Sequence, residues 1–500
     1  MRCYLIFFVI MLTSFAGVSS MAATKIDFNT VDVLTYRYYQ EKKWDSLIVI
    51  GKQALRQDID YYYLRVRLGI AYFEKKAYFQ ATTHLEKAWQ FNSGDPVIAN
   101  YLYFAYLYSN RFEEAGLIKS SMSEEARQNV LIKHSVIYGV MQEVHAEGGY
   151  TISSDNAPEN LTTLTESDSI YGEQDLYGNS SNSNFGLKLK VSNRIGLTLA
   201  YNYLNFTKTK YIRYGRIEDH FQYISDSSGY KIYHYDFPRV MYDTAFTYHV
   251  KQHEAYIAAV VVFPWGLKIM PVFHFIHVSY PVIRASYSLT QVPDTSYYNS
   301  SENSYGTFSF DRTIYSYARN DTSFNNYLAA IQISKVFRIF NVALSGSWSN
   351  LNGKKQKQAD ISLTCYPLGN LDLYSTTTAT GFFQGKDKRL LLSQILGFKI
   401  TSWMWWEANF YLGNYTNANI FNGYIVYNNS DIIDYRGGAN LLFFLGSHFQ
   451  LSLIYQYFRK ESRQYYYTKD PATNEINEIP QTRNNPYYTN TLIGGITWKF

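Results

Sequence analysis

The C-terminal segment of this 500-residue chain constrains its fold more than any other part. Residues 489–500 read TNTLIGGITWKF. In an extended strand the side chains alternate with a period of two, so Leu492, Ile496, Trp498 and Phe500 fall on one face. The segment therefore predicts a strand that is apolar on one side and ends on an aromatic residue.

The same period runs through residues 136–500. Phe340, Val342, Leu344 and Trp348, for example, alternate with polar or small residues. Such strands are apolar on one face, polar on the other and ten or more residues long, which is typical of strands between lipid and a wet lumen. The alternative is a soluble all-β domain, but its strands more often have about five or six residues.

We predict fourteen antiparallel strands, although twelve or sixteen would also fit the pattern. Short turns alternate with long loops, as in outer-membrane barrels. The predicted strands are 136–153, 183–192, 195–211, 250–263, 266–280, 324–336, 339–350, 356–366, 371–384, 388–400, 403–418, 434–445, 448–464 and 487–500. The predicted long loops are 154–182, 212–249, 281–323, 419–433 and 465–486.

The N-terminus predicts export from the cytoplasm. An apolar stretch, 4–12, is followed by small residues and a Ser20-Met21-Ala22 step, so residues 1–22 are expected to be a secretory signal. The stretch is too short to span roughly 30 Å of hydrocarbon as an anchor. The 18% aromatic content, with 50 Tyr, suits membrane interfaces and sheet surfaces.

Residues 23–130 contain a repeat of 34 residues. Leu34, Leu68 and Leu102 recur at this interval, and further columns are formed by Tyr38, Tyr72 and Tyr106, by Trp44, Tyr78 and Phe112, and by Leu47, Ala81 and Ala115. This pattern resembles the tetratricopeptide repeat, a pair of packed helices. Three repeats are about the minimum for a stable solenoid. An unrelated helical bundle is the alternative.

Charged residues on the polar strand faces are candidates for a lumen lining. If they face the lumen, their mixed signs favour a general or plugged pore over a charge-selective one; otherwise they are simply wetted wall residues. The candidates are Glu143, Glu147, Lys188, Lys190, Lys268, Asp360, Lys399, Glu407 and Arg436. In the repeats, Tyr62, Tyr63 and Tyr101 are candidates for contact with a partner.

We predict no catalytic residues, no metal site and no cofactor. No nucleophile motif, phosphate loop or zinc signature occurs. A net charge of +5 over this length does not argue for nucleic-acid binding. The chain is therefore predicted not to be an enzyme.

The order of signal, repeats and barrel resembles two bacterial outer-membrane families, the exopolysaccharide-export porins and the surface lipoprotein assembly modulators. The second family, with a barrel of about fourteen strands, fits this chain better. The C-terminal strand resembles the signal read by the outer-membrane assembly machinery, which would recognise Trp498 and Phe500. The resemblance implies an outer-membrane barrel in contact with lipid, repeats in the periplasm and long loops outside the cell.

The expected function is export or surface display of a protein or polysaccharide that the repeats capture. The alternative is a non-conducting surface anchor, receptor or adhesin whose repeats bind a periplasmic partner.

Overall fold

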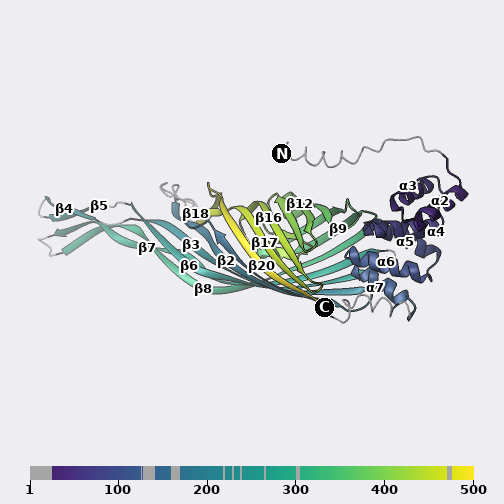
Figure 1. Cartoon of the computed structure of the whole chain (residues 1–500). Helices are drawn as coiled ribbons and strands as arrows, with labels where there is room; N and C mark the ends of the chain where they lie inside the picture. Colours follow the sequence, from purple (N-terminus) through teal and green to yellow (C-terminus); the bar gives the residue numbers. More distant parts are fainter. Residues whose placement is uncertain are drawn as a thin grey trace. The chain divides into compact units, whose positions relative to one another are not determined.

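The computed structural model describes residues 25–124, 127, 141–158, 169–217, 220–227, 230–236, 239–263, 266–299, 304–428, 430–469 and 476–500. The predicted signal peptide, 1–22, lies outside these residues. The chain divides into two compact units, one containing the helices and the other the wall strands (Figure 1). Within the described residues, no helix has the length and apolar character needed to cross a membrane.

The described residues of the helical unit form three helix pairs, which confirms the repeat solenoid. The first helices of the pairs start 34 residues apart, as do the second helices. The pairs are α2 (Phe28–Gln40) with α3 (Trp44–Arg56), α4 (Tyr62–Glu74) with α5 (Tyr78–Phe91), and α6 (Pro96–Tyr108) with α7 (Phe112–Ser121). The predicted columns form the core, where Leu47, Leu68, Ala81, Leu102 and Ala115 are buried.

The turns inside the helix pairs repeat in conformation as well as in sequence. Lys42, Lys76 and Asn110, which are 34 residues apart, have φ values of 53°, 60° and 58°. In each turn the next residue donates its backbone N–H to the carbonyl of a tyrosine five residues earlier, at 2.9 Å. These bonds join Lys43 to Tyr38, Ala77 to Tyr72 and Arg111 to Tyr106. This left-handed residue with a bond back into the helix is a common helix stop, so each turn ends its helix in the same way.

The second unit is a closed antiparallel barrel of fourteen wall strands, as predicted. It closes because β1 (Met141–Ser153) pairs with β20 (Tyr487–Lys499) over eleven residue pairs from Glu143↔Lys499 to Ser153↔Thr489. The other wall strands are β2 (Ser169–Lys190), β3 (Ile195–Ile217), β6 (Arg239–Val262), β7 (Leu267–Asn299), β8 (Ser304–Phe337), β9 (Phe340–Ser349), β10 (Gln356–Cys365), β11 (Leu373–Gln384), β12 (Asp387–Thr401), β13 (Met404–Leu412), β16 (Ile432–Leu445) and β17 (Phe449–Glu461).

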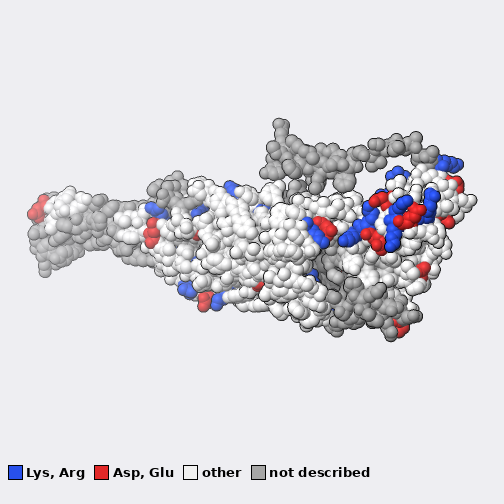
Figure 2. Space-filling model, viewed as in Figure 1, with Lys and Arg blue, Asp and Glu red and all other residues white. Residues whose placement is uncertain are grey.

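The outer face of the wall is apolar. Leu344 is 54% exposed, and Leu492, Ile496 and Trp498 are also exposed. Figure 2 shows that the visible face of the strand unit carries few charged side chains. Exposed apolar side chains along one face of a sheet are unfavourable in water but suit contact with hydrocarbon.

The described residues of two segments that the sequence predicts as long loops, 212–249 and 281–323, are strands instead. The predicted loops 154–182 and 465–486 also contain strand residues, at 169–182, 465–469 and 476–482. In the first two segments β3, β6, β7 and β8 continue past the wall as a projecting sheet (Figure 1). At its end lie β4 (His220–Ser227) and β5 (Tyr230–Asp236), and β18 (Arg463–Lys469) and β19 (Ile476–Thr482) extend the sheet beside β2.

Side-chain packing explains why the segments of the projecting sheet are extended. The loop prediction gave weight to the Ser, Asn and Asp residues of these segments. The same segments also contain Tyr, Ile and Thr, which favour strands. The ring centroids of Phe246 and Tyr317 lie 5.2 Å apart, and both rings pack against a cluster in which Ile212 and Ile283 are buried. Cross-strand aromatic contacts thus stabilise a sheet where turns were expected.

Candidate functional site in the barrel lumen

Residues 413–431, here called the lumen loop, connect β13 to β16 and fold into the barrel. The loop contains the short strands β14 (Asn419–Ile420) and β15 (Ile425–Val426), which pair with each other. Its tip contacts distant parts of the wall. Nδ1 of His274 on β7 lies 2.6 Å from the carbonyl oxygen of Gly423, and the hydroxyl of Tyr424 donates to Asn184 on β2 at 3.1 Å. The loop therefore reaches across the lumen.

Polar side chains of the wall hold the backbone of the lumen loop. The Gln358 side chain on β10 donates to the carbonyl of Asn419 at 3.1 Å and accepts its N–H at 2.8 Å, as a neighbouring strand would. Arg389 on β12 donates to the carbonyls of Asn414 and Thr416 at 2.6 and 3.0 Å. Backbone groups away from water need such partners, so the wall supplies what a sheet would otherwise provide.

The tip of the lumen loop requires a glycine. Phe421, Asn422 and Gly423 all have positive φ, at 52°, 55° and 78°. A Cβ atom on Gly423 would lie 2.3 Å from Cδ2 of Leu328 on β8. Both the backbone conformation and the close approach to the wall thus exclude a side chain here.

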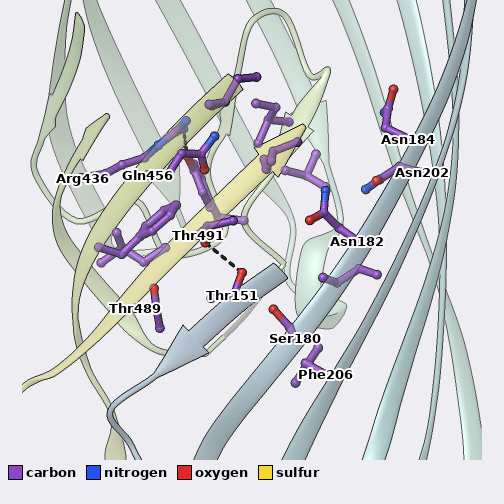
Figure 3. A pocket seen from close by; sticks show the side chains of 18 of the residues that line it. Thr151, Ser180, Asn182, Asn184, Asn202, Phe206, Arg436, Gln456, Thr489 and Thr491 are labelled. Atoms are coloured by element: carbon purple, nitrogen blue, oxygen red, sulfur yellow. Dashed lines mark hydrogen bonds between the residues drawn. The ribbon is translucent and has the colours of Figure 1, made fainter. Parts of the chain in front are cut away.

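Between the lumen loop and the wall lies a chamber of about 480 Å³ (Figure 3). Amides are the main polar groups of its lining, and tyrosine and phenylalanine rings are as numerous. The amides belong to Asn182, Asn184, Asn202, Gln252, Asn409, Asn428, Asn440 and Gln456. The rings belong to Tyr177, Phe206, Tyr411, Phe421, Tyr424, Tyr427, Phe458 and Tyr487.

Strand register places several lining groups in rows. Asn184 lies opposite Glu147 of β1 on one side and Asn202 of β3 on the other, and Asn202 lies opposite Glu254 of β6. Because Asn182 precedes Asn184 by two residues, it points to the same face of β2. Figure 3 shows Asn182, Asn184 and Asn202 beside the hollow.

Most charged side chains that line the chamber form hydrogen bonds with neighbouring side chains. Glu407 accepts from the hydroxyl of Tyr374 at 2.7 Å and from Nδ2 of Asn440 at 2.6 Å. Glu254 accepts from Gln252 and lies 3.3 Å from Nε2 of His274.

Arg436 ties the lumen loop to the wall. Its guanidinium donates to the hydroxyl of Tyr427 at 2.5 Å and lies 4.7 Å from the ring centroid of Tyr411. This geometry combines a charge-assisted hydrogen bond with a cation–π contact. Arg436 therefore holds the C-terminal half of the loop.

The predicted lumen candidates are distributed over several environments. Glu147, Glu407 and Arg436 line the chamber. Away from it, Glu143 and Lys188 form an ion pair at 2.8 Å, Asp360 accepts from Ser345 at 2.9 Å and from Thr380, and Lys399 lies 3.5 Å from Asp372. Lys190 ends β2 and Lys268 lies at the start of β7, both next to short turns.

The sequence predictions missed the amides and the inward fold of the lumen loop. They extended the strand that is β13 to residue 418, although it ends at Leu412, and expected the following loop to lie outside the cell. They considered charged residues only, although Asn184 shares its face with the predicted candidates Lys188 and Lys190. Asn182 lay in a predicted loop, and strand β2 in fact begins earlier. Counting amides as well as charges on the polar faces would have found Asn184 and Asn202.

The repeat candidates differ in accessibility. Tyr63 is 61% exposed, and the Arg67 guanidinium lies 5.8 Å from its ring centroid. Tyr62 donates its hydroxyl to Asp95, and Tyr101 packs edge-on against Phe73 at 5.0 Å. The Tyr63 side chain is thus accessible from solvent, whereas Tyr62 and Tyr101 are engaged in contacts between helices.

The C-terminal residues Trp498 and Phe500 are both exposed on the outer face of the barrel. The Trp498 ring stacks on His448 at 5.7 Å. Among the described residues, no group of three His, Cys, Asp or Glu side chains is placed to hold a metal ion.

No protein-family model matches the sequence, and no curated protein matches it. Among solved structures, the helical region is similar to MamA AMB-1, with 23% identity over 19% of this chain and a TM-score of 0.18. The match covers 52% of that chain, so this protein spans about half the length of MamA.

The barrel is similar in fold to two outer-membrane barrels. A Pseudomonas aeruginosa FadL homologue matches at 8% identity, covering 72% of this chain and 90% of its own, with a TM-score of 0.38. The Acinetobacter baumannii outer membrane protein Omp33 matches at 9% identity, covering 73% of this chain and 100% of its own, with a TM-score of 0.31.

Proposed function

We propose that the protein is an outer-membrane channel that exports or displays a polar chain, a polysaccharide or a protein, at the bacterial surface. The observation that carries the proposal is the chamber of about 480 Å³, a space lined by amides and aromatic rings inside an apolar-faced barrel. A barrel that served only as an anchor would gain stability by filling this space with packed side chains.

The lumen loop supports a channel whose width is controlled. It narrows the lumen without filling it, because the chamber remains along β1, β2, β3, β17 and β20. Narrow constrictions govern what passes through a channel. In this proposal the loop sets the width of the path, and Tyr63 in the periplasmic repeats contributes to capture of the exported chain.

The proposal also includes the surroundings of the barrel. Lipid contacts its outer face, the projecting sheet lies outside the cell, and the assembly machinery reads Trp498 and Phe500. The proposed protein is not an enzyme and works without a cofactor.

Single-channel recording tests the proposal. Full-length protein in a planar bilayer should give stepwise currents with weak ion selectivity, because the lining carries both signs of charge. A variant lacking residues 23–130 should conduct at least as well. Silence of both proteins, with folding shown by circular dichroism, would overturn the channel.

The second candidate is a non-conducting surface anchor. The many hydrogen bonds that fix the lumen loop favour it, since a permanently seated loop would block long substrates. An anchor predicts no current and a periplasmic partner that co-purifies through the repeats but not with the Tyr63→Ala variant.

A further inference from the structure

We infer that the chamber is a binding site for a neutral, hydroxyl-rich chain, an oligosaccharide, held by the free amides of β2, β3 and β17. This inference rests on the proposed function in one respect, because it names the class of polymer that would pass through the proposed channel.

The first argument is that amides facing the chamber have no partner within the protein. The side chains of Asn182, Asn202 and Gln456 line the chamber and form no hydrogen bond with any residue that the structure describes. An amide offers donors and acceptors together, which matches a sugar hydroxyl that also does both. These three groups surround the hollow from different strands (Figure 3).

The second argument is independent and concerns buried polar atoms. Oγ1 of Thr489, Oδ1 of Asn409 and the hydroxyl of Tyr411 have no hydrogen-bond partner in the described part of the protein. Their residues line the chamber and are only 4%, 7% and 2% exposed. A buried polar group without a partner costs about 1–3 kcal/mol. Native proteins keep few such groups. Three of them around one space indicate that the hydroxyls of a ligand or of water supply the missing hydrogen bonds.

Aromatic rings supply the apolar part of a sugar site. Tyr177 and Tyr487 present nearly parallel rings, with centroids 6.2 Å apart and an interplanar angle of 2°. Phe206 lies 6.2 Å from Tyr177 in a similar orientation. Sugar rings have apolar faces and polar edges, so a lining that combines aromatic rings with free amides suits them.

The charge balance disfavours a strongly charged chain. Three of the five charged lining residues, Glu254, Glu407 and Arg436, are engaged with neighbours. The remaining two have opposite signs: Glu147 lies opposite Asn184, and Lys460 lies opposite Tyr487. The three acids and two bases of the lining leave a formal net charge of −1, so the chamber offers no strong attraction for a polyanion or a polycation.

The barrel architecture disfavours a peptide as the occupant. Extended peptides bind by adding a strand to a free sheet edge. The closed wall has no such edge along the chamber, because β1 pairs with β20 and each wall strand around the chamber has neighbours on both sides. What the lumen offers instead is side-chain amides and rings.

The test is binding of maltohexaose, a neutral glucan, to full-length protein by titration calorimetry and by current blockade in bilayers. We expect saturable binding of maltohexaose and none of a Gly-Ser peptide, a hexagalacturonate or a chitosan hexamer. Asn182→Leu and Asn202→Leu should each weaken binding about tenfold, since each removes hydrogen bonds at nearly constant volume.

Asn490→Leu is the matched control. Asn490 is exposed on the outer face of β20, where it accepts from the hydroxyl of Tyr455 at 2.7 Å. Its substitution should leave binding unchanged while introducing the same side chain.

The outcomes separate this inference from the channel proposal. Calorimetric binding that the two chamber variants weaken supports the inference even if the protein passes no current. No binding of maltohexaose, tighter binding of a charged oligomer or of the peptide, or equal affinities of all variants would overturn it, even where the channel conducts.

Discussion

Two insertions between wall strands, most of whose residues the sequence predicts as loops, fold in opposite ways. Residues 413–431 turn into the lumen, whereas 212–249 and 281–323 run outward as a projecting sheet. Among the described residues, the lumen loop has five positive φ angles, at Gly413, Asn417, Phe421, Asn422 and Gly423. The described residues of the projecting strands β3, β6, β7 and β8 have none.

The difference shows how an insertion satisfies its backbone. The projecting strands pair with each other in register, so that Ile217 still lies opposite Arg239 far from the turn end of the barrel. The strands of the lumen loop pair only two residues with two others, and further partners come from backbone bonds such as Tyr415 N–H to the Ile433 carbonyl and from wall side chains such as Gln358. An insertion that pairs with itself projects, and one that pairs with the wall is held inside.

The largest effect is expected from shortening the lumen loop. Oγ1 of Thr416 donates to the carbonyl of Asp431 at 2.6 Å, so a Gly-Ser-Gly linker can replace residues 417–430. Removing the constriction should raise single-channel conductance about twofold or more. An unchanged conductance in the folded variant would show that the loop does not narrow the path.

A smaller effect is expected from Gly423→Ala. Alanine with positive φ costs about 1–2 kcal/mol, and its Cβ would also meet Leu328. The loop should then leave its seat more often, which should increase current fluctuations several-fold.

Gly446→Ala is the matched control for this substitution. Gly446 has a φ of 74°, close to the 78° of Gly423, but a Cβ there would meet no atom within 4 Å. Equal behaviour of the two variants would mean that the contact with Leu328 has no role.

A weaker, pH-dependent effect is expected from Asp431, which directly precedes β16 and lies outside the spanning strands. Burial raises its pKa from 3.8 to about 7, while the Tyr487 hydroxyl, Lys460 and Lys208 favour the charged form and Asp175 opposes it. Since the seated loop raises this pKa, protonation favours the seated state. This stabilisation of the seated loop is complete below 3.8, the ordinary pKa of an aspartate, and is lost as pH rises through about 7.

Recordings across this range provide the measurement. Current fluctuations should increase a few-fold from about pH 5 to about pH 8, and Asp431→Asn should remove the dependence. Increased fluctuations at the acid end would contradict the sign of this account.

The smallest effect on conductance is expected from trimming the projecting sheet. Because Ile217 and Arg239 are directly opposed, Asn-Gly can replace residues 218–238 as a two-residue hairpin. Conductance should match that of the full chain. A large change would show that the sheet controls the path and that the two insertions do not differ in this respect.

Much of the architecture followed from periodicity. The 34-residue spacing predicted the helix pairs, and alternation predicted all fourteen wall strands, because both signals are local. The inward fold of the lumen loop was not predictable in this way. Its partners Asn184, His274 and Gln358 lie far away in sequence, and no local pattern shows that an amide will bond a particular carbonyl.

Accessibility of the two insertions to a bulky thiol reagent tests the central claim most directly. In a Cys365→Ser background, a cysteine replaces either Val426 of the lumen loop or Asp226 of β4, and intact protein in membranes is treated with a polyethylene-glycol maleimide. The account predicts a mass shift on gels for the Asp226 variant and none for the Val426 variant until the protein is denatured. Equal labelling of both variants in the folded protein would contradict it.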